Sequence, residues 1–446
     1  MKTSLFKEAR LINRGKIFEG DLLVKGHRIE RIDSSINVEG SVTEIPVSGR
    51  YLIPGIIDDQ VHFREPGLEH KGNIYSESRA AIAGGVTSFM EMPNTQPPAF
   101  TQRLLEDKYE IAQHTSLANY SFYMGTSNDN YDEVMRTNEK RKTVCGVKIF
   151  MGSSTGNLLV DNPLALDKIF SNSELLIATH CEDEQIIREN LARLKSEKDV
   201  LEPSDHPLIR SDEACFASSF RAIQYAKKYG SRLHILHIST EKELQLFTNL
   251  LPLRDKKITA EVCVHHLHFT SNDYERLGNK IKCNPAIKAP DNKAALWNAL
   301  LEDRLDVIAT DHAPHTLEEK KLPYEKAHAG LPLVQHALML MLYYHREGKI
   351  TLEKIAEKMS HAVATCFEIE DRGFVRETYF ADLVLVDLNK SFTVKQDNIL
   401  YKCGWSPLEA FTFPASVTHT FVNGNLVYEN NTFDESNKGM RLKFTR

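Results

Sequence analysis

The sequence lacks any apolar run near the roughly 20 residues that a membrane-spanning helix needs. Its first segment, MKTSLFKEARLINRGKIFEG, also lacks the apolar core of a secretory signal. There is no basic stripe and no long run of one charge, because 55 Lys and Arg are interspersed with 61 Asp and Glu. We therefore expect a cytoplasmic protein that binds neither membranes nor nucleic acid.

Paired cysteine motifs are also missing. The seven cysteines are scattered along the chain, and none forms a C-x-x-C pair. An odd number without paired spacing argues against a disulfide framework and against a cysteine-based zinc knuckle. We expect buried, reduced thiols.

Eight short apolar runs do recur between residues 51 and 365, and most are separated by helix-like stretches. They span residues 51–63, 87–94, 121–125, 144–151, 175–183, 232–240, 258–266 and 306–315. Strands that are apolar on both faces and alternate with helices are typical of parallel sheets, so the pattern predicts an α/β fold with a (β/α)8 TIM-like barrel over residues 54–368. A doubly wound open sheet is the competing layout, but no G-x-G-x-x-G follows the first run.

The two ends of the chain have a different pattern. Residues 1–53 and 369–446 alternate and turn like antiparallel β structure, and Asn423-Gly424 is a hairpin signal. We predict that both termini together form a small β-sandwich-like domain, with residues 1–53 as its N-terminal part and 369–446 as its C-terminal part and tail.

Polar side chains lie at or near the ends of most of these runs. They are His62, Arg64, Asn94, Lys148, His180, His237, His265, His266, Asp311, His312 and His315. In a barrel, the C-terminal ends of the strands share one face, where catalytic groups collect. One such histidine alone would more often be structural. The whole set would be costly to bury without a metal or a substrate to pair with.

The residue types favour a particular metal. Imidazoles with a carboxylate and no clustered thiolate favour zinc or a similar divalent ion with one position open for water. A lysine ammonium has no lone pair for a metal. If Lys148 is desolvated, however, its neutral amine can take up carbon dioxide to form a carbamate, which is an anionic bridge with two oxygens.

Several motifs resemble those of the metal-dependent cyclic amidohydrolases, and most closely those of the dihydroorotases. They are DDQVHFREPG, MPNTQPP, GVKIFMGSSTG, ATHCEDE, LHILHIST, CNPAIK and TDHAPHTLEEK. The resemblance runs from about Pro54 to Gly330, and the segment ADLVLVD also fits. HFREPG and TDHAPH are the most specific parts.

The resemblance implies reversible hydrolysis of dihydroorotate to N-carbamoyl-L-aspartate by a metal-activated hydroxide, as a step of pyrimidine biosynthesis. It implies one or two zinc ions, with these ligands: His62, Lys148 as a bridging carbamate, His180, His237 and Asp311. Asp311 would also be the general base. Arg64, Asn94 and His315 would bind the substrate carboxylate, and Asn284 would bind the pyrimidine ring.

Gln60 departs from the family pattern, because it stands where the first histidine of an H-x-H pair is usual. On a strand, Asp58, Gln60 and His62 share one face, so Asp58 is a possible substitute ligand. We predict weaker binding of the deeper ion, held by His62, Lys148 and Asp311, than of the ion held by His180 and His237.

Three interpretations remain open: a dihydroorotase, a hydrolase of another cyclic amide such as allantoin or a hydantoin, and a non-catalytic scaffold. Arg64 favours a substrate with a ring carboxylate, since an arginine fork suits a planar anion. We expect residues 313–332 to act as a mobile lid. His265 and His266 are expected to have supporting or structural roles, and a homodimer is expected on general grounds.

Overall fold

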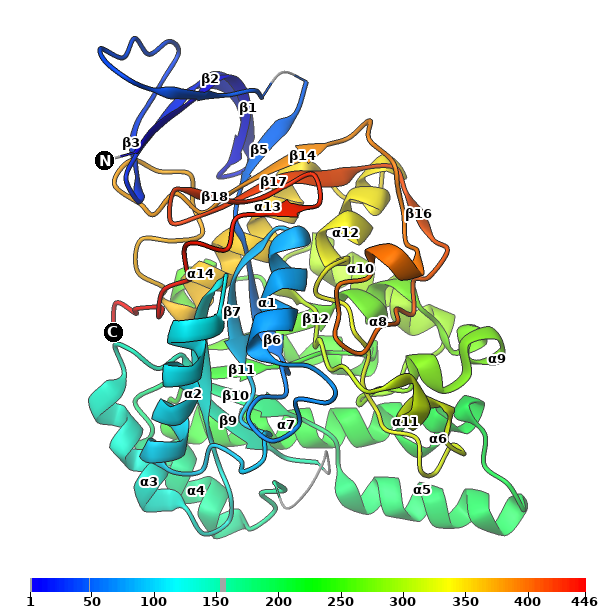
Figure 1. Cartoon of the computed structure of the whole chain (residues 1–446). Coiled ribbons are helices and arrows are strands. Elements are labelled where there is room, and N and C mark those ends of the chain that lie inside the picture. The colour runs from blue at the N-terminus through cyan, green and yellow to red at the C-terminus, as the bar shows by residue number, and fades with distance from the viewer. Residues whose placement is uncertain (1, 48, 153–157) are drawn as a thin grey trace.

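The computed structural model describes residues 2–47, 49–152 and 158–446. Eight parallel strands pair in chain order around a barrel (Figure 1). They are β6 (Ile56–Val61), β7 (Val86–Glu91), β8 (Asn119–Gly125), β9 (Gly146–Phe150), β10 (Ile177–His180), β11 (Leu233–Ile235), β12 (Ile258–Cys263) and β13 (Val307–Ala309). A parallel bridge between Val61 and His312 closes the ring. The predicted barrel is confirmed.

Helices follow the barrel strands and cover the outside of the ring (Figure 1). The helices are α1 (Ile74–Ala83), α2 (Gln102–Thr115), α3 (Tyr131–Arg136), α4 (Pro163–Asn172), α5 (Glu184–Glu197), α6 (His206–Ile209), α7 (Asp212–Tyr229), α8 (Val264–His268), α9 (Tyr274–Leu277), α10 (Pro290–Leu301), α11 (Leu317–Lys321), α12 (Ala337–Arg346), α13 (Leu352–Ala356) and α14 (Ala362–Phe367). Side-chain caps define several starts, such as Ser211 at α7, and Gly230 ends α7 in the left-handed conformation.

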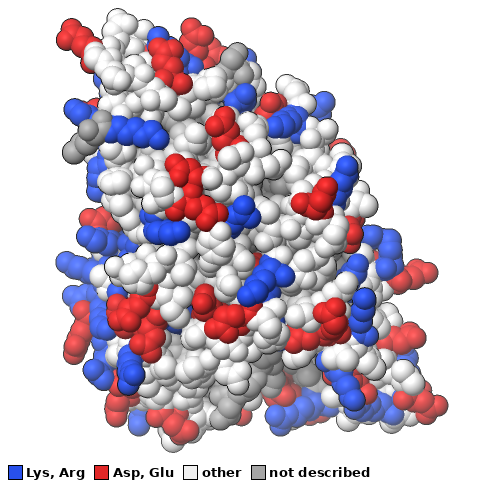
Figure 2. All heavy atoms as spheres, in the orientation of Figure 1, with Lys and Arg blue, Asp and Glu red and all other residues white. Residues whose placement is uncertain are grey.

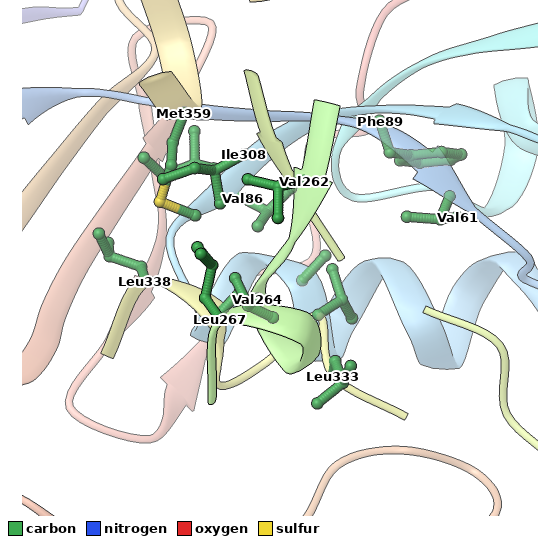
Figure 3. Packing of buried hydrophobic residues seen from close by; sticks show 14 of the residues in the cluster. Val61, Val86, Phe89, Val262, Val264, Leu267, Ile308, Leu333, Leu338 and Met359 are labelled. Carbon is green, nitrogen blue, oxygen red and sulfur yellow. The ribbon is translucent and has the colours of Figure 1, made fainter. Parts of the chain in front are cut away.

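The barrel strands are buried because both of their faces are covered. Every residue of β6, β7, β8 and β9 is buried, which explains their near-continuous apolar character. The hydrophobic core between barrel and helices includes Val61, Phe89 and Val262 (Figure 3). This packing fixes the strand ends that carry the polar residues.

Strands from both chain ends form a separate sheet, seen in Figure 1 as blue and orange-to-red strands lying together. It contains β1 (Thr3–Asn13), β2 (Lys16–Lys25), β3 (Arg28–Asp33), β4 (Thr43–Ile45), β5 (Tyr51–Pro54), β14 (Leu383–Asp387), β17 (Ser416–Val422), β18 (Asn425–Glu429) and β19 (Thr432–Phe433). β15 (Phe392–Thr393) and β16 (Thr412–Phe413), which lie between β14 and β17 in the sequence, form a two-stranded sheet of their own. The predicted β-domain from both termini is confirmed.

The terminal sheet is mixed rather than purely antiparallel. β5 pairs parallel with β1 and antiparallel with β14, so it joins strands from the two chain ends. Close to the C-terminus, the chain leaves this sheet and returns to the barrel, where the Leu442 amide donates to the Tyr120 carbonyl at 2.9 Å. The exact domain boundaries stay a proposal.

The surface is consistent with the balanced composition. Lys and Arg are interspersed with Asp and Glu over the face drawn in Figure 2. Among the described residues, no helix combines the length and the apolar character needed to cross a membrane.

The Asn423-Gly424 turn yields a prediction. Both residues have positive φ, 51° and 75°, as a type I′ hairpin between β17 and β18 requires. A Cβ added to Gly424 would lie 2.1 Å from the Gly26 carbonyl oxygen, whereas Gly15, with φ 70°, has nothing within 4 Å. Gly424→Ala should therefore lower the free energy of unfolding by about 1 kcal/mol or more beyond the loss for Gly15→Ala, measured by denaturant titration. Equal losses would show that Gly26 moves away freely.

Candidate functional site

A cavity of about 450 Å³ opens at the C-terminal ends of the barrel strands. Eight residues singled out from the sequence line it: His62, Arg64, Asn94, His180, His237, Asn284, Asp311 and His315. Lys148 lies on β9 and is only 1% exposed. The structure thus gathers residues that are up to 253 positions apart in the sequence, from His62 to His315, around one space.

His62 and Asp311 form the first candidate ligand pair. The His62 Nδ1–H donates to Asn94 Oδ1 at 2.6 Å, which leaves the Nε2 lone pair directed to Asp311 Oδ1 at 3.1 Å. Burial lowers the pKa of His62, although Asp311 opposes this. An imidazole nitrogen that lies this close to a carboxylate oxygen needs a proton or a metal ion between them, and an imidazole whose N–H is held by a carbonyl is typical of metal ligands.

His180 and His237 form the second pair, with His180 Nδ1 lying 3.0 Å from His237 Nε2. Burial lowers the pKa of both rings, so both are neutral at neutral pH. Glu182 Oε2 lies 3.1 Å from the other nitrogen of His180 and also forms an ion pair with Arg210. Glu182 thereby orients His180, as carboxylates do behind metal-bound histidines.

Lys148 lies within electrostatic range of both candidate ligand pairs. Its charge interacts with Asp311 of the first pair and with His180 and His237 of the second. Burial lowers the pKa of Lys148 to about 7, although Asp311 raises it again. Nζ lies 4.5 Å from the centre of the Phe150 ring, and within the described ranges no acid group forms an ion pair with it. A large share of this lysine is therefore a neutral amine at neutral pH.

Gln60 does not present its oxygen as a ligand. Its Nε2 donates to Asp311 Oδ1 at 3.0 Å, and its Oε1 faces Cys263 Sγ at 3.8 Å. Asp58 accepts hydrogen bonds from the amide and hydroxyl of Thr310. Asp58 is thus held by Thr310, and Gln60 positions Asp311; a substitute ligand role for Asp58 stays a prediction.

Arg64 and His315 form a cationic wall of the cavity. The His315 Nδ1 accepts from Lys71 Nζ at 3.1 Å, so Nε2 carries the ring proton and donates to the Ala329 carbonyl at 3.0 Å. Arg64 Nη2 lies 3.0 Å from this same Nε2. Arg64 Nε donates to the Pro314 carbonyl at 3.0 Å, and no carboxylate of the described residues forms an ion pair with the guanidinium. Burial lowers the pKa of Arg64 to about 10, so it stays charged at neutral pH.

Some cavity residues have no signal in the strand pattern. His206 is the first residue of α6, and its Nε2 lies 3.1 Å from Asn284 Oδ1 while its Nδ1 lies 2.7 Å from the Tyr324 hydroxyl. Lys71, which hydrogen-bonds to His315 of the cavity wall, was also missed, because it follows the first strand by ten positions. Only the tertiary fold brings such residues to the cavity and its wall.

The segment expected to be a lid does border the cavity, since residues 324–330 line it. Lys320 holds this segment, because its Nζ donates to the carbonyl groups of His328 and Gly330 at 2.8 and 2.9 Å. Whether the segment moves stays a prediction.

A buried triad lies behind His237. His234 Nε2 lies 3.2 Å from Asp59 Oδ2 and 3.3 Å from Glu261 Oε2. Burial disfavours protonation, but the hydrogen bonds to Asp59 and Glu261 raise the pKa of His234 to about 9. Glu261 Oε1 also accepts a hydrogen bond from the main-chain amide of His237 at 3.0 Å, so the triad fixes the backbone of His237.

A model of the amidohydrolase family matches residues 51–427. The chain belongs to the amidohydrolase family. It is 30% identical to a dihydroorotase of Pyrococcus furiosus over 437 residues, which cover 98% of this chain and 95% of the relative. It is 31% identical to a dihydroorotase of Methanosphaera stadtmanae, with 85% and 86% covered.

Solved structures show the same fold. An L-hydantoinase (dihydropyrimidinase) from Arthrobacter aurescens superposes with a TM-score of 0.91 at 24% identity, covering 97% of this chain and 98% of the other. A dihydropyrimidinase from Brevibacillus agri gives 0.89 at 21% identity, with both chains fully covered. These structures support the barrel with its terminal sheet.

The position of Gln60 leads to a prediction about metal retention. Gln60→His replaces a neutral amide by an imidazole beside His62 and Asp311, so it should increase the metal retained per chain after dialysis against a chelator. Gln60→Asn is the control, because it keeps the amide chemistry. Metal analysis that finds equal retention in Gln60→His and the native protein would contradict a ligand deficit at this position.

Lys148 leads to a prediction about pH. A pKa of about 7 means that the neutral amine rises about tenfold between pH 6 and pH 8, and only the neutral amine reacts with carbon dioxide. Metal uptake by the metal-free protein, at fixed dissolved carbon dioxide, should speed up about tenfold over this range. Lys148→Ala should remove the dependence on carbon dioxide. Uptake by native protein that is independent of carbon dioxide would argue against a carbamate.

Proposed function

We propose that this chain is a dihydroorotase, which interconverts dihydroorotate and N-carbamoyl-L-aspartate. The observation that supports this is the buried, charged guanidinium of Arg64, which lines the cavity beside the two ligand pairs and forms no ion pair with a carboxylate among the described residues. Dihydroorotate carries a carboxylate next to its cyclic amide, so one substrate satisfies both features. The relatives named dihydroorotase support the same choice.

The residues fit a metal centre of one or two zinc ions. His62 and Asp311 would hold one ion, His180 and His237 the other, and a carbamate on Lys148 would bridge them. A cation held by these residues would lower the pKa of a water molecule and polarise the ring carbonyl. Gln60 adds no oxygen to the first site, so the His62 site is the weaker one.

Asp311 is the proposed general base. It lies on the cavity wall with Oδ1 fixed by Gln60 Nε2. In ring opening, Asp311 accepts the proton of the attacking water and delivers it to the leaving ring nitrogen. In ring closure, it removes the proton from the attacking carbamoyl nitrogen. The same group therefore serves both directions.

Substrate orientation follows from the remaining wall residues. Asn94 uses its oxygen to accept from His62, so its amide N–H groups are left for the substrate carboxylate together with Arg64 and His315. Asn284, whose oxygen faces His206, is proposed to bind the pyrimidine ring. Cytoplasmic location, a role in pyrimidine biosynthesis and a homodimer belong to the same proposal.

Arg64 provides the test of substrate choice. Losing a charged hydrogen bond costs about 2 to 4 kcal/mol, so Arg64→Ala should lower kcat/KM for dihydroorotate by roughly 30- to 1,000-fold. Turnover of dihydrouracil, the same ring without the carboxylate, should change little. Steady-state kinetics on both substrates provide the measurement. An equal loss of kcat/KM on dihydroorotate and dihydrouracil would make Arg64 a structural residue. Preferred turnover of uncharged rings by the native protein would favour a hydantoinase-like activity.

A further inference from the structure

A second group of potential ligands lies behind the cavity wall. His265 and His266 lie on α8, directly after β12, and Cys283 follows the short helix η6 (Gly278–Ile281). One ligand atom from each residue lies within 4.8 Å of the other two. All three are nearly inaccessible, at 1%, 3% and 1% exposure, and none lines the cavity. The group is therefore separate from the two ligand pairs.

Three of the four ring nitrogens in this group lack partners. Within the described part of the chain, both nitrogens of His265 and Nδ1 of His266 have no hydrogen bond. A buried polar atom without a partner destabilises the folded protein, because it has lost its hydrogen bonds to water. Three such atoms side by side, with the two rings 4.2 Å apart between centroids, indicate that a ligand is needed there.

The protonation of the rings leaves lone pairs for that ligand. His266 Nε2 donates to the Pro285 carbonyl at 3.2 Å, so Nδ1 carries the lone pair. Burial lowers the pKa of His265, whereas the Thr310 main chain raises it, so Thr310 favours a protonated ring nitrogen on that side. The contact does not have the geometry of a hydrogen bond. An imidazole that gives its N–H to a main-chain carbonyl is the usual arrangement of a metal-bound histidine.

We propose that His265, His266 and Cys283 bind a zinc ion. Imidazole nitrogens and a thiolate are preferred zinc ligands, and one buried water molecule would complete the four-coordinate site. Zinc–ligand bonds of about 2.0 to 2.3 Å place the ligand atoms roughly 3.3 to 3.8 Å from one another. The three ligand atoms here lie within 4.8 Å of one another, so small rotations of the side chains bring them to that spacing. The ion displaces the thiol proton of Cys283, which passes to solvent.

The position of this ion gives it a structural consequence. Val264 and Leu267 anchor α8 in the hydrophobic core, as Figure 3 shows. Cys283 immediately precedes Asn284 of the cavity wall. The ion would therefore tie the loop that carries Asn284 to a helix that is fixed by the core.

Cobalt substitution tests the proposal on the full-length protein. Thiolate-bound Co²⁺ gives a near-ultraviolet charge-transfer band that imidazole and carboxylate ligands do not give, so the cobalt-loaded native protein should show it. Cys283→Ser should abolish the band and lower bound metal by about one ion per chain. Cys181→Ser and Cys263→Ser are the matched controls, since these buried cysteines adjoin His180 and Gln60, and both should keep the band.

Absence of the band in the native protein, or its loss in either control variant, would overturn the proposal. Thiol alkylation of the native protein supplies a second measurement that is independent of any variant's folding. After mild chelation at a temperature below unfolding, Cys283 should be alkylated faster, as measured by mass spectrometry, and added zinc should restore protection. Equal alkylation with and without zinc would also overturn it.

Discussion

The main-chain hydrogen bond from His62 to His312, at 2.7 Å, closes the barrel and creates the site. It joins the end of β6 to the segment after β13, and so places His62 beside Asp311. Without this closure, an open sheet would leave His62 and Asp311 at opposite edges. The candidate catalytic centre is therefore a product of ring closure and not of any single strand.

Backbone strain is located where the chemistry is proposed. Arg64, His237 and Asp311 are non-glycine residues with positive φ, at 74°, 40° and 47°. This conformation costs of order 1 to 3 kcal/mol and persists only where the surroundings enforce it. Buried carboxylates supply that support for two of them: Glu91 accepts from the Arg64 amide at 3.2 Å, and Glu261 accepts from the His237 amide at 3.0 Å. Acidic residues on neighbouring strands thus aim the side chains at the cavity.

The strand pattern predicted the barrel, the terminal sheet and seven of the residues that line the cavity, because alternation and strand ends reflect local geometry. It could not reveal His206, which lines the cavity from α6, or Lys71, which hydrogen-bonds to His315 of the cavity wall, since neither residue ends a strand. The function of Gln60 was also hidden, because the same side chain can offer an oxygen or an amide N–H. Pairings such as His234 with Asp59 depend on which strands become neighbours across the barrel interior, and composition carries no information on that.

The pairing of β5 with both β1 and β14 has a consequence for the order of events during synthesis. β14 begins at Leu383, long after the barrel strands, so β5 has an open edge until most of the chain has left the ribosome. An exposed strand edge is a template for pairing with other chains. The N-terminal strands therefore stay partly unpaired until the barrel segment, which lies between the two halves of this sheet in the sequence, has been synthesised.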